Sequence, residues 1–183
     1  MRVHFRHIRL RISSILLLIV LLLAPSFNTK SSLADNDLSE NDIKALFILN
    51  FIKYVNWPPE IDKSSIRIGI AGDSPVLESL LKVIRNRREN KNIRVERLDP
   101  NAGTIYQIIF VTAEESGKIM RWNRKYAGKG VLIISDGCKS NCVASINLIN
   151  IDNKIRFEIN TFAAQACGIK ISTRLMELAT SVE

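Results

Sequence analysis

Apolar residues recur along the chain with two different periods, which locate the predicted strands and helices. Strands are predicted where the residues alternate or are continuously apolar, at residues 66–71, 93–98, 106–111 and 130–134. Between them, apolar residues at helical spacing predict helices over residues 76–84 and from residue 114 to about residue 126. Strands and helices that alternate in this way are typical of an α/β domain with a mostly parallel sheet.

The C-terminal part of the chain follows a different pattern. Residues 145–150 and 154–160 both alternate, and Asp152-Asn153 between them favours a hairpin turn. Asn160 then suits the N-cap of a last helix, which is interrupted at Gly168. The sequence therefore predicts an antiparallel hairpin at the end of the mostly parallel sheet.

The first predicted helix is apolar around nearly its whole circumference. Ser39 and an acidic first turn indicate its start, and it runs to about Val55. Such a helix is expected to be buried on more than one side. Asn50 is its odd polar member, and we expect this side chain to be hydrogen-bonded internally. Pro58-Pro59 ends the helix, because a residue before proline avoids helical geometry, and this places Trp57 at the corner.

The first 34 residues have the layout of a secretory signal peptide. Four arginines precede an apolar run at residues 15–24, and Ser32 and Ala34 form a small-x-small cleavage site. This run is shorter than the roughly 20 residues that cross a bilayer, so an uncleaved anchor is the less favoured alternative. We expect a signal peptide at 1–34 and an exported, periplasmic or extracellular domain at 35–183.

Removal of the signal peptide changes the charge and the available chemistry. Residues 1–34 hold five of the 26 lysines and arginines and none of the 18 acidic residues, so the mature domain has a net charge of +3. A mildly positive domain is not predicted to bind nucleic acid. Both histidines, His4 and His7, are also lost. This excludes a histidine general base, a Ser-His-Asp or Cys-His nucleophile system and any histidine-bound metal.

Gly72-Asp73-Ser74 allows two interpretations. GDSL-type hydrolases place their nucleophile in such a block, but they need a histidine base, which the mature domain lacks. We favour a strand-to-helix turn in which Ser74 is the N-cap and Pro75 the first helical residue.

A basic run at residues 82–91 also allows two interpretations. It is either a patch for nucleic acid or a membrane surface, or the solvated end of a helix, where cations complement the helix dipole. We favour the helix end, because no aromatic residues are interleaved for base stacking.

Three cysteines lie in the mature domain. Cys138 and Cys142 are close enough in sequence for a small disulfide ring, which an oxidising compartment favours, whereas two thiolates alone make an incomplete zinc site. Cys167 lies among small apolar residues and is expected to be a buried free thiol. Whether Cys142 pairs with Cys138 or with Cys167 stays open.

The last predicted strand has a polar face. Arg156, Glu158 and Asn160 share one side of the strand, because side chains alternate with period two. This face is either an ordinary solvent face or a recognition face for a protein partner or small ligand.

Several blocks together resemble one known family. Residues 44–58, 66–73, 156–160 and 168–175, in that order behind a signal peptide, are similar to the YfiR family. This resemblance implies a three-layer α/β sandwich with a Rossmann-like, mostly parallel sheet. It also implies a regulator without catalytic residues, cofactor or metal, and a disulfide between Cys138 and Cys142. A second disulfide found in the family lacks obvious partners here.

The resemblance also implies partners for the domain. Members of the family form dimers and repress an inner-membrane diguanylate cyclase by binding its periplasmic sensor domain, and an outer-membrane lipoprotein can sequester them. We predict a homodimer with such partners, controlling cyclic-di-GMP and biofilm formation. The expected contact residues are Arg156, Glu158 and Asn160, with Trp57 and Pro58. The alternative function is binding of a small periplasmic ligand, either an aromatic amino acid or a nucleotide.

Overall fold

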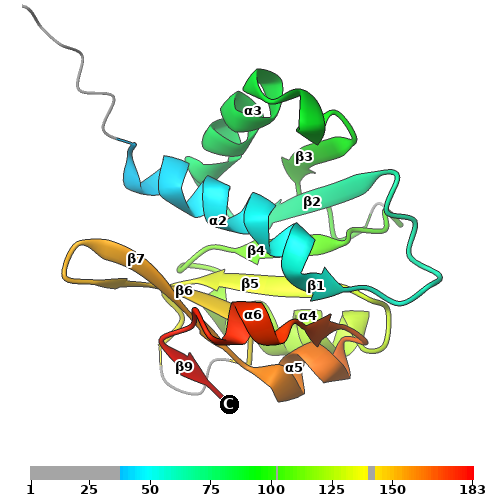
Figure 1. Ribbon diagram of the computed structural model, residues 1–183. Helices are drawn as coiled ribbons and strands as arrows, with labels where there is room; N and C mark the ends of the chain where they lie inside the picture. The colour runs from blue at the N-terminus through cyan, green and yellow to red at the C-terminus, as the bar shows by residue number, and fades with distance from the viewer. Residues whose placement is uncertain (1–37, 102, 140–142) are drawn as a thin grey trace, which may run out of the picture. The chain divides into compact units, whose positions relative to one another are not determined.

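A seven-stranded sheet forms the centre of the unit that begins at Leu38 (Figure 1). The computed structural model describes residues 38–101, 103–139 and 143–183, so the predicted signal peptide lies outside the described residues. The strand order is β3-β2-β4-β5-β6-β7-β9. The strands are β2 (Ile66–Ala71), β3 (Ile93–Arg97), β4 (Ile108–Val111), β5 (Leu132–Asp136), β6 (Ile146–Ile151), β7 (Lys154–Ile159) and β9 (Ser181–Val182).

Most neighbouring strands of this sheet are parallel. The pairs from β3 to β6 are parallel, as is β7 with β9, and only β6 and β7 are antiparallel. Asp152 and Asn153 connect β6 to β7 with φ of 50° and 59°, the left-handed geometry that a tight hairpin turn requires. The predicted α/β fold with an antiparallel C-terminal hairpin is confirmed.

Helices cover both faces of the sheet, as Figure 1 shows. Ile68, Ile70 and Phe110 pack in a cluster with α2 and α3, whereas Ile109 and Ile133 pack in a second cluster with α4. Alternate residues of the continuously apolar strands thus point into two cores, one on each face of the sheet. The sheet and the helices on its two faces form three layers. The helices are α2 (Glu40–Tyr54), α3 (Val76–Asn86), α4 (Ile119–Tyr126), α5 (Thr161–Ala166) and α6 (Thr173–Met176), with 3₁₀ turns η1 (Arg88–Asn90) and η2 (Ser116–Lys118).

Helix α2 is fixed at its start by a capping box. The Ser39 hydroxyl accepts from the Asp42 backbone N–H at 3.1 Å, and the Asp42 carboxylate accepts from the Ser39 N–H at 3.3 Å. The helix contacts α3, α6 and β7, so burial on several sides is confirmed. The internal position expected for Asn50 is wrong, because this side chain is exposed to solvent. The elements packed around α2 leave the side of the helix that carries Asn50 uncovered.

The chain leaves α2 through a short strand that the pattern did not predict. Strand β1 (Val55–Asn56) pairs with β8 (Lys170–Ile171) in a separate two-stranded sheet. Two-residue strands have no periodicity to detect. This pairing brings the end of α2 next to the segment that follows Gly168. The last predicted helix is interrupted there, because α5 ends and β8 and α6 follow.

The basic run lies at the end of α3 and beyond it. Lys82 lies 3.5 Å from the Asp42 carboxylate, and Arg87 lies 3.8 Å from Glu89. Both cations have side chains that are at least half exposed, at 63% and 50%. These contacts agree with the solvated helix end favoured from the sequence.

Candidate functional site

The three residues predicted to form a polar face on β7 occupy different environments. Arg156 is exposed and forms no ion pair with any described residue. Glu158 is half-buried and accepts from Asn147 Nδ2 at 3.0 Å. Asn160 caps α5 by accepting from the Ala163 N–H at 2.7 Å. Of the three, only Arg156 has a side chain available for a partner.

Asn147 on β6 is the centre of a buried polar network behind this face. Its Oδ1 accepts from Ser135 Oγ at 2.8 Å and from the backbone N–H of Cys138 at 3.0 Å. Its Nδ2 donates to the Cys138 carbonyl at 3.1 Å and to Glu158. The amide is 5% exposed and therefore depends on these partners for its hydrogen bonds. The network joins β5, β6, β7 and the loop that starts at Gly137.

Trp57 and Pro58 do not join the polar face of β7. Trp57 is 7% exposed and belongs to the apolar cluster on the α2 side, together with Phe157. Arg156 points to the opposite side of β7 from Phe157, because neighbouring side chains on a strand alternate. Pro58 lines a cavity at another edge of the sheet. The structure therefore does not bring the five predicted contact residues together on one surface.

The cysteines also differ in their surroundings. Cys138 is half-buried and its backbone is held by Asn147, whereas Cys142 lies outside the described residues, so their predicted disulfide remains a prediction. Cys167 is fully buried as a free thiol, as expected, with its Sγ 3.7 Å from Asn123 Oδ1. Burial raises the pKa of the Cys167 thiol. It is thus suited to packing and not to redox chemistry at neutral pH.

Alkylation should leave Cys167 untouched in the native protein. Because the thiol is fully buried and its pKa is raised, we expect iodoacetamide to label it at least about a hundredfold more slowly than in denaturant. Mass spectrometry of the peptide that contains Cys167 measures both rates, and the denatured sample serves as the control. Rates within tenfold of each other would show that the thiol is accessible in the folded state.

The Gly72-Asp73-Ser74 turn lies at the point where the strand order reverses, between β2 and β4. In open α/β sheets this carboxyl-end crevice commonly binds ligands. Here Gly72 has φ of 101°, and a Cβ on it would clash with Thr112 Oγ1, so the side chain of Thr112 already fills the space. Ser74 Oγ accepts from the Val76 N–H at 3.2 Å. The N-cap predicted at Ser74 is wrong by one residue, because Pro75 occupies the N-cap of α3 and the helix begins at Val76.

A charged cluster that sequence reasoning missed lies at the carboxyl end of β5. The Lys44 ammonium lies 2.8 Å from Asp136 and 2.7 Å from Glu40, and Asn150 donates to Glu40 at 3.2 Å. Burial alone lowers the pKa of Lys44, but its hydrogen bonds to Asp136 and Glu40 outweigh burial and raise the pKa overall. The hydrogen bond from Lys44 lowers the pKa of Glu40. The cluster fixes α2 to the sheet, and only the fold brings its members together.

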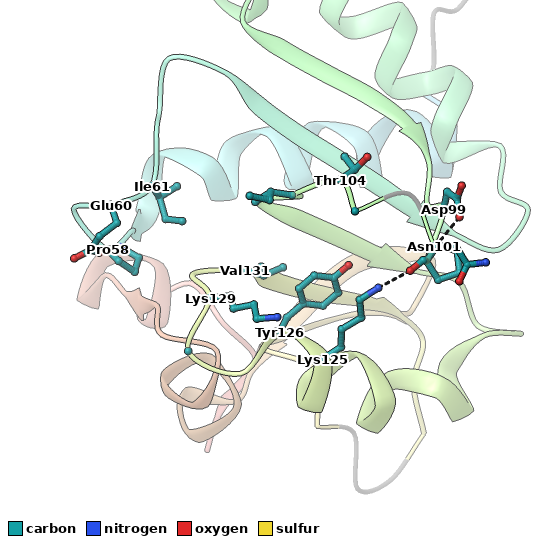
Figure 2. A pocket seen from close by; sticks show the side chains of 14 residues that line it. Pro58, Glu60, Ile61, Asp99, Asn101, Thr104, Lys125, Tyr126, Lys129 and Val131 are labelled. Carbon is teal, nitrogen blue, oxygen red and sulfur yellow. Dashed lines mark hydrogen bonds between the residues drawn. The ribbon is translucent and has the colours of Figure 1, made fainter.

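A cavity of about 630 Å³ lies beside the amino ends of β4 and β5, away from the charged cluster at the carboxyl end of β5 (Figure 2). The loop before β2, the loop between β3 and β4, the loop before β5 and the end of α4 form its walls. Its apolar lining includes Pro58, Ile61, Ile105, Tyr126 and Val131, and its charged lining comprises Glu60, Asp99, Lys125 and Lys129. The volume lies in the usual range for small-molecule sites. Apart from Pro58, none of these residues was predicted to line a site, because they lie in separate loops.

The described residues form a small α/β domain with a mostly parallel sheet. Within residues 38–101, 103–139 and 143–183, no acidic, histidine or cysteine side chains are grouped in a way that could hold a metal ion. In the same ranges, no helix is long and apolar enough to cross a membrane. Residues 41–180 match the family model described as YfiR/HmsC-like, and the chain belongs to this family. Membership indicates a periplasmic regulator in cyclic-di-GMP signalling rather than an enzyme.

Proposed function

We propose that this protein represses an inner-membrane diguanylate cyclase by binding the cyclase's periplasmic sensor domain. Membership of the YfiR/HmsC-like family supports this proposal. The lack of histidine after His7 also supports a binding role, because the commonest general base is missing from the mature domain. The hydroxyl of Ser74, the residue that most resembled a nucleophile, already accepts from the Val76 N–H.

The proposal is supported by exposed cationic and apolar side chains on the outward side of the β6–β7 hairpin. Arg156 lies opposite Ile149, and Lys154 lies opposite Ile151, so these four residues share one side of the sheet. We name these four residues the hairpin face. Arg156, Lys154 and Ile151 are exposed, and Ile151 retains 40% of its accessible surface. Apolar contact area beside an unpaired arginine is common at protein interfaces.

The charge of the hairpin face indicates the kind of surface that it binds. Both charged members, Lys154 and Arg156, are cationic, and neither is paired with a described acidic residue. The complementary surface on the cyclase is therefore acidic with an apolar centre. Binding represses the cyclase if the hairpin face has a higher affinity for its inactive conformation than for its active one. A lipoprotein that covers the same face would relieve repression by competition.

Reversal of the charge at Arg156 tests the proposed surface. Because a cation would be replaced by an anion that repels the acidic partner, Arg156→Glu should weaken binding of the cyclase sensor domain by about tenfold or more. Cyclic-di-GMP in cells should rise toward the level of the gene deletion. Calorimetry with the purified sensor domain measures the first effect, and mass spectrometry of cell extracts measures the second.

Arg124→Glu is the matched control. Arg124 is also exposed, but it lies on α4 and outside the hairpin face, so its reversal should leave both measurements unchanged. If the Arg156→Glu protein accumulated normally and still repressed the cyclase, the hairpin face would not be the contact surface. If deletion of the gene left cyclic-di-GMP unchanged, cyclase repression itself would be wrong. Light scattering of the purified protein would test the proposed homodimer.

A further inference from the structure

We propose that the cavity beside Tyr126 is a binding site for a small aromatic carboxylate. The site is separate from the hairpin face, because its lining comes from the loops at the amino ends of β4 and β5 and from the end of α4. The inference does not depend on cyclase repression, since it concerns the chain by itself.

The Tyr126 ring and two lysines in the cavity lining indicate the kind of ligand. Figure 2 shows the Tyr126 ring between Lys125 and Lys129. The ring stacks on Trp122 with centroids 6.3 Å apart, and this holds it in place as a platform. Ile61 and Val131 supply apolar contacts around it. A flat, six-membered ring is the shape that such a platform favours.

The two ammonium groups lack acidic partners. Lys125 Nζ donates to the neutral Pro100 carbonyl at 2.6 Å and lies 5.5 Å from the Tyr126 ring centre. Neither Lys125 nor Lys129 forms an ion pair with any residue in the described ranges. An ammonium group without an acidic partner beside apolar surface is well placed to bind a carboxylate through charge-assisted hydrogen bonds.

Hydrogen bonds hold the backbone on both sides of Lys129. Gly128 and Gly130 flank it with φ of 68° and 66°. The Gly128 N–H donates to the Ala166 carbonyl at 2.9 Å, and the Gly130 N–H donates to the Cys167 carbonyl at 2.8 Å. A Cβ on Gly130 would come within 2.8 Å of Ile61, so the loop packs closely against the opposite wall. A backbone that is already ordered lowers the entropy cost of ligand binding at this loop.

Two carboxylates, Glu60 and Asp99, also line the cavity, and neither forms an ion pair with a lysine of the lining. Glu60 lies at one end of the view in Figure 2, and Asp99 lies at the other. The Asp99 carboxylate already accepts from the Asn101 N–H at 2.8 Å. Because these acids are negatively charged, they should repel ligands that carry several negative charges. We therefore propose a ligand with a single carboxylate and not a phosphate.

Three isosteric probes test the charge preference. Benzoate, benzyl alcohol and benzylamine are titrated into the purified ¹⁵N-labelled protein, and the amide shifts of Tyr126, Gly128 and Lys129 are followed. We expect saturable shifts with benzoate, and dissociation constants at least about tenfold higher for the two other probes. Absence of saturable shifts at these amides would overturn the proposal. Equal or tighter binding of benzylamine would also overturn it, because the acids would then select the ligand.

Matched variants separate binding at this cavity from binding elsewhere. Lys129→Gln should weaken benzoate binding by about tenfold, whereas Lys154→Gln on the hairpin face should leave it unchanged. Ile105, at 67% exposure, lines the cavity, and Ile105→Trp should block it without disturbing the core. Met120→Trp on α4, at 63% exposure, is its control. Unchanged affinity in both Lys129→Gln and Ile105→Trp would show that benzoate binds elsewhere.

Discussion

Replacing Phe157 with alanine is expected to lower the free energy of unfolding by about 3–5 kcal/mol. Phe157 is 4% exposed on the inward side of β7. Its ring centre lies 5.2 Å from that of Phe51 and 5.7 Å from that of Phe47, both edge to face. Truncation would leave a cavity between α2 and the hairpin, and the aromatic contacts would be lost as well. Urea unfolding followed by circular dichroism measures the change.

Phe162→Ala is the matched control for this prediction. Phe162 lies on α5 and is 75% exposed, so its removal should change the free energy of unfolding by no more than about 0.5 kcal/mol. A cost below about 1 kcal/mol for Phe157→Ala would mean that α2 does not depend on the hairpin for its packing. Domains of this size are stable by only about 5–15 kcal/mol, so the expected loss would also reduce the amount of protein in cells.

The fold could be predicted wherever the determining signal is local. Alternation at residues 154–159 assigned Phe157 to the core and Arg156 to the outside, because strand geometry depends only on the period. The turn at Asp152-Asn153 likewise follows from residues that tolerate positive φ. In contrast, the helical period of α2 contains no information about which side of the helix the other elements leave uncovered. The exposure of Asn50 could therefore not be predicted.

The functional surfaces were less predictable, because distant segments form them. Period two placed Arg156 and Glu158 on one side of β7, whereas Asn160 lies beyond the end of the strand, at the N-cap of α5. Their partners, Asn147 for Glu158 and the start of α5 for Asn160, decide that only Arg156 is available. The cavity beside Tyr126 depends on loops before three different strands, and no sequence period connects such loops. Local pattern thus gives the orientation of a side chain, and tertiary pairing gives its role.

The two sides of the β6–β7 hairpin are stabilised by different interactions, apolar packing on one side and hydrogen bonds on the other. Phe157 on the inward side pairs with Leu148, and the side chains there are apolar. On the outward side, Glu158 pairs with Asn147, whose amide connects it to Ser135 and Cys138. A buried polar network of this kind contributes mainly by avoiding unsatisfied groups, so loss of its central member should cost more than a surface hydrogen bond does.

Asn147→Ala should therefore lower the free energy of unfolding by about 3 kcal/mol. Alanine would leave the buried Ser135 hydroxyl and the Cys138 backbone without the amide that they contact at 2.8–3.1 Å. The Cys138 amide proton should also exchange faster with deuterium. Asn150→Ala on the same strand removes only an exposed hydrogen bond to Glu40 and should cost about 0.5 kcal/mol or less. Equal costs for the two variants would mean that the network does not fix the loop to the hairpin.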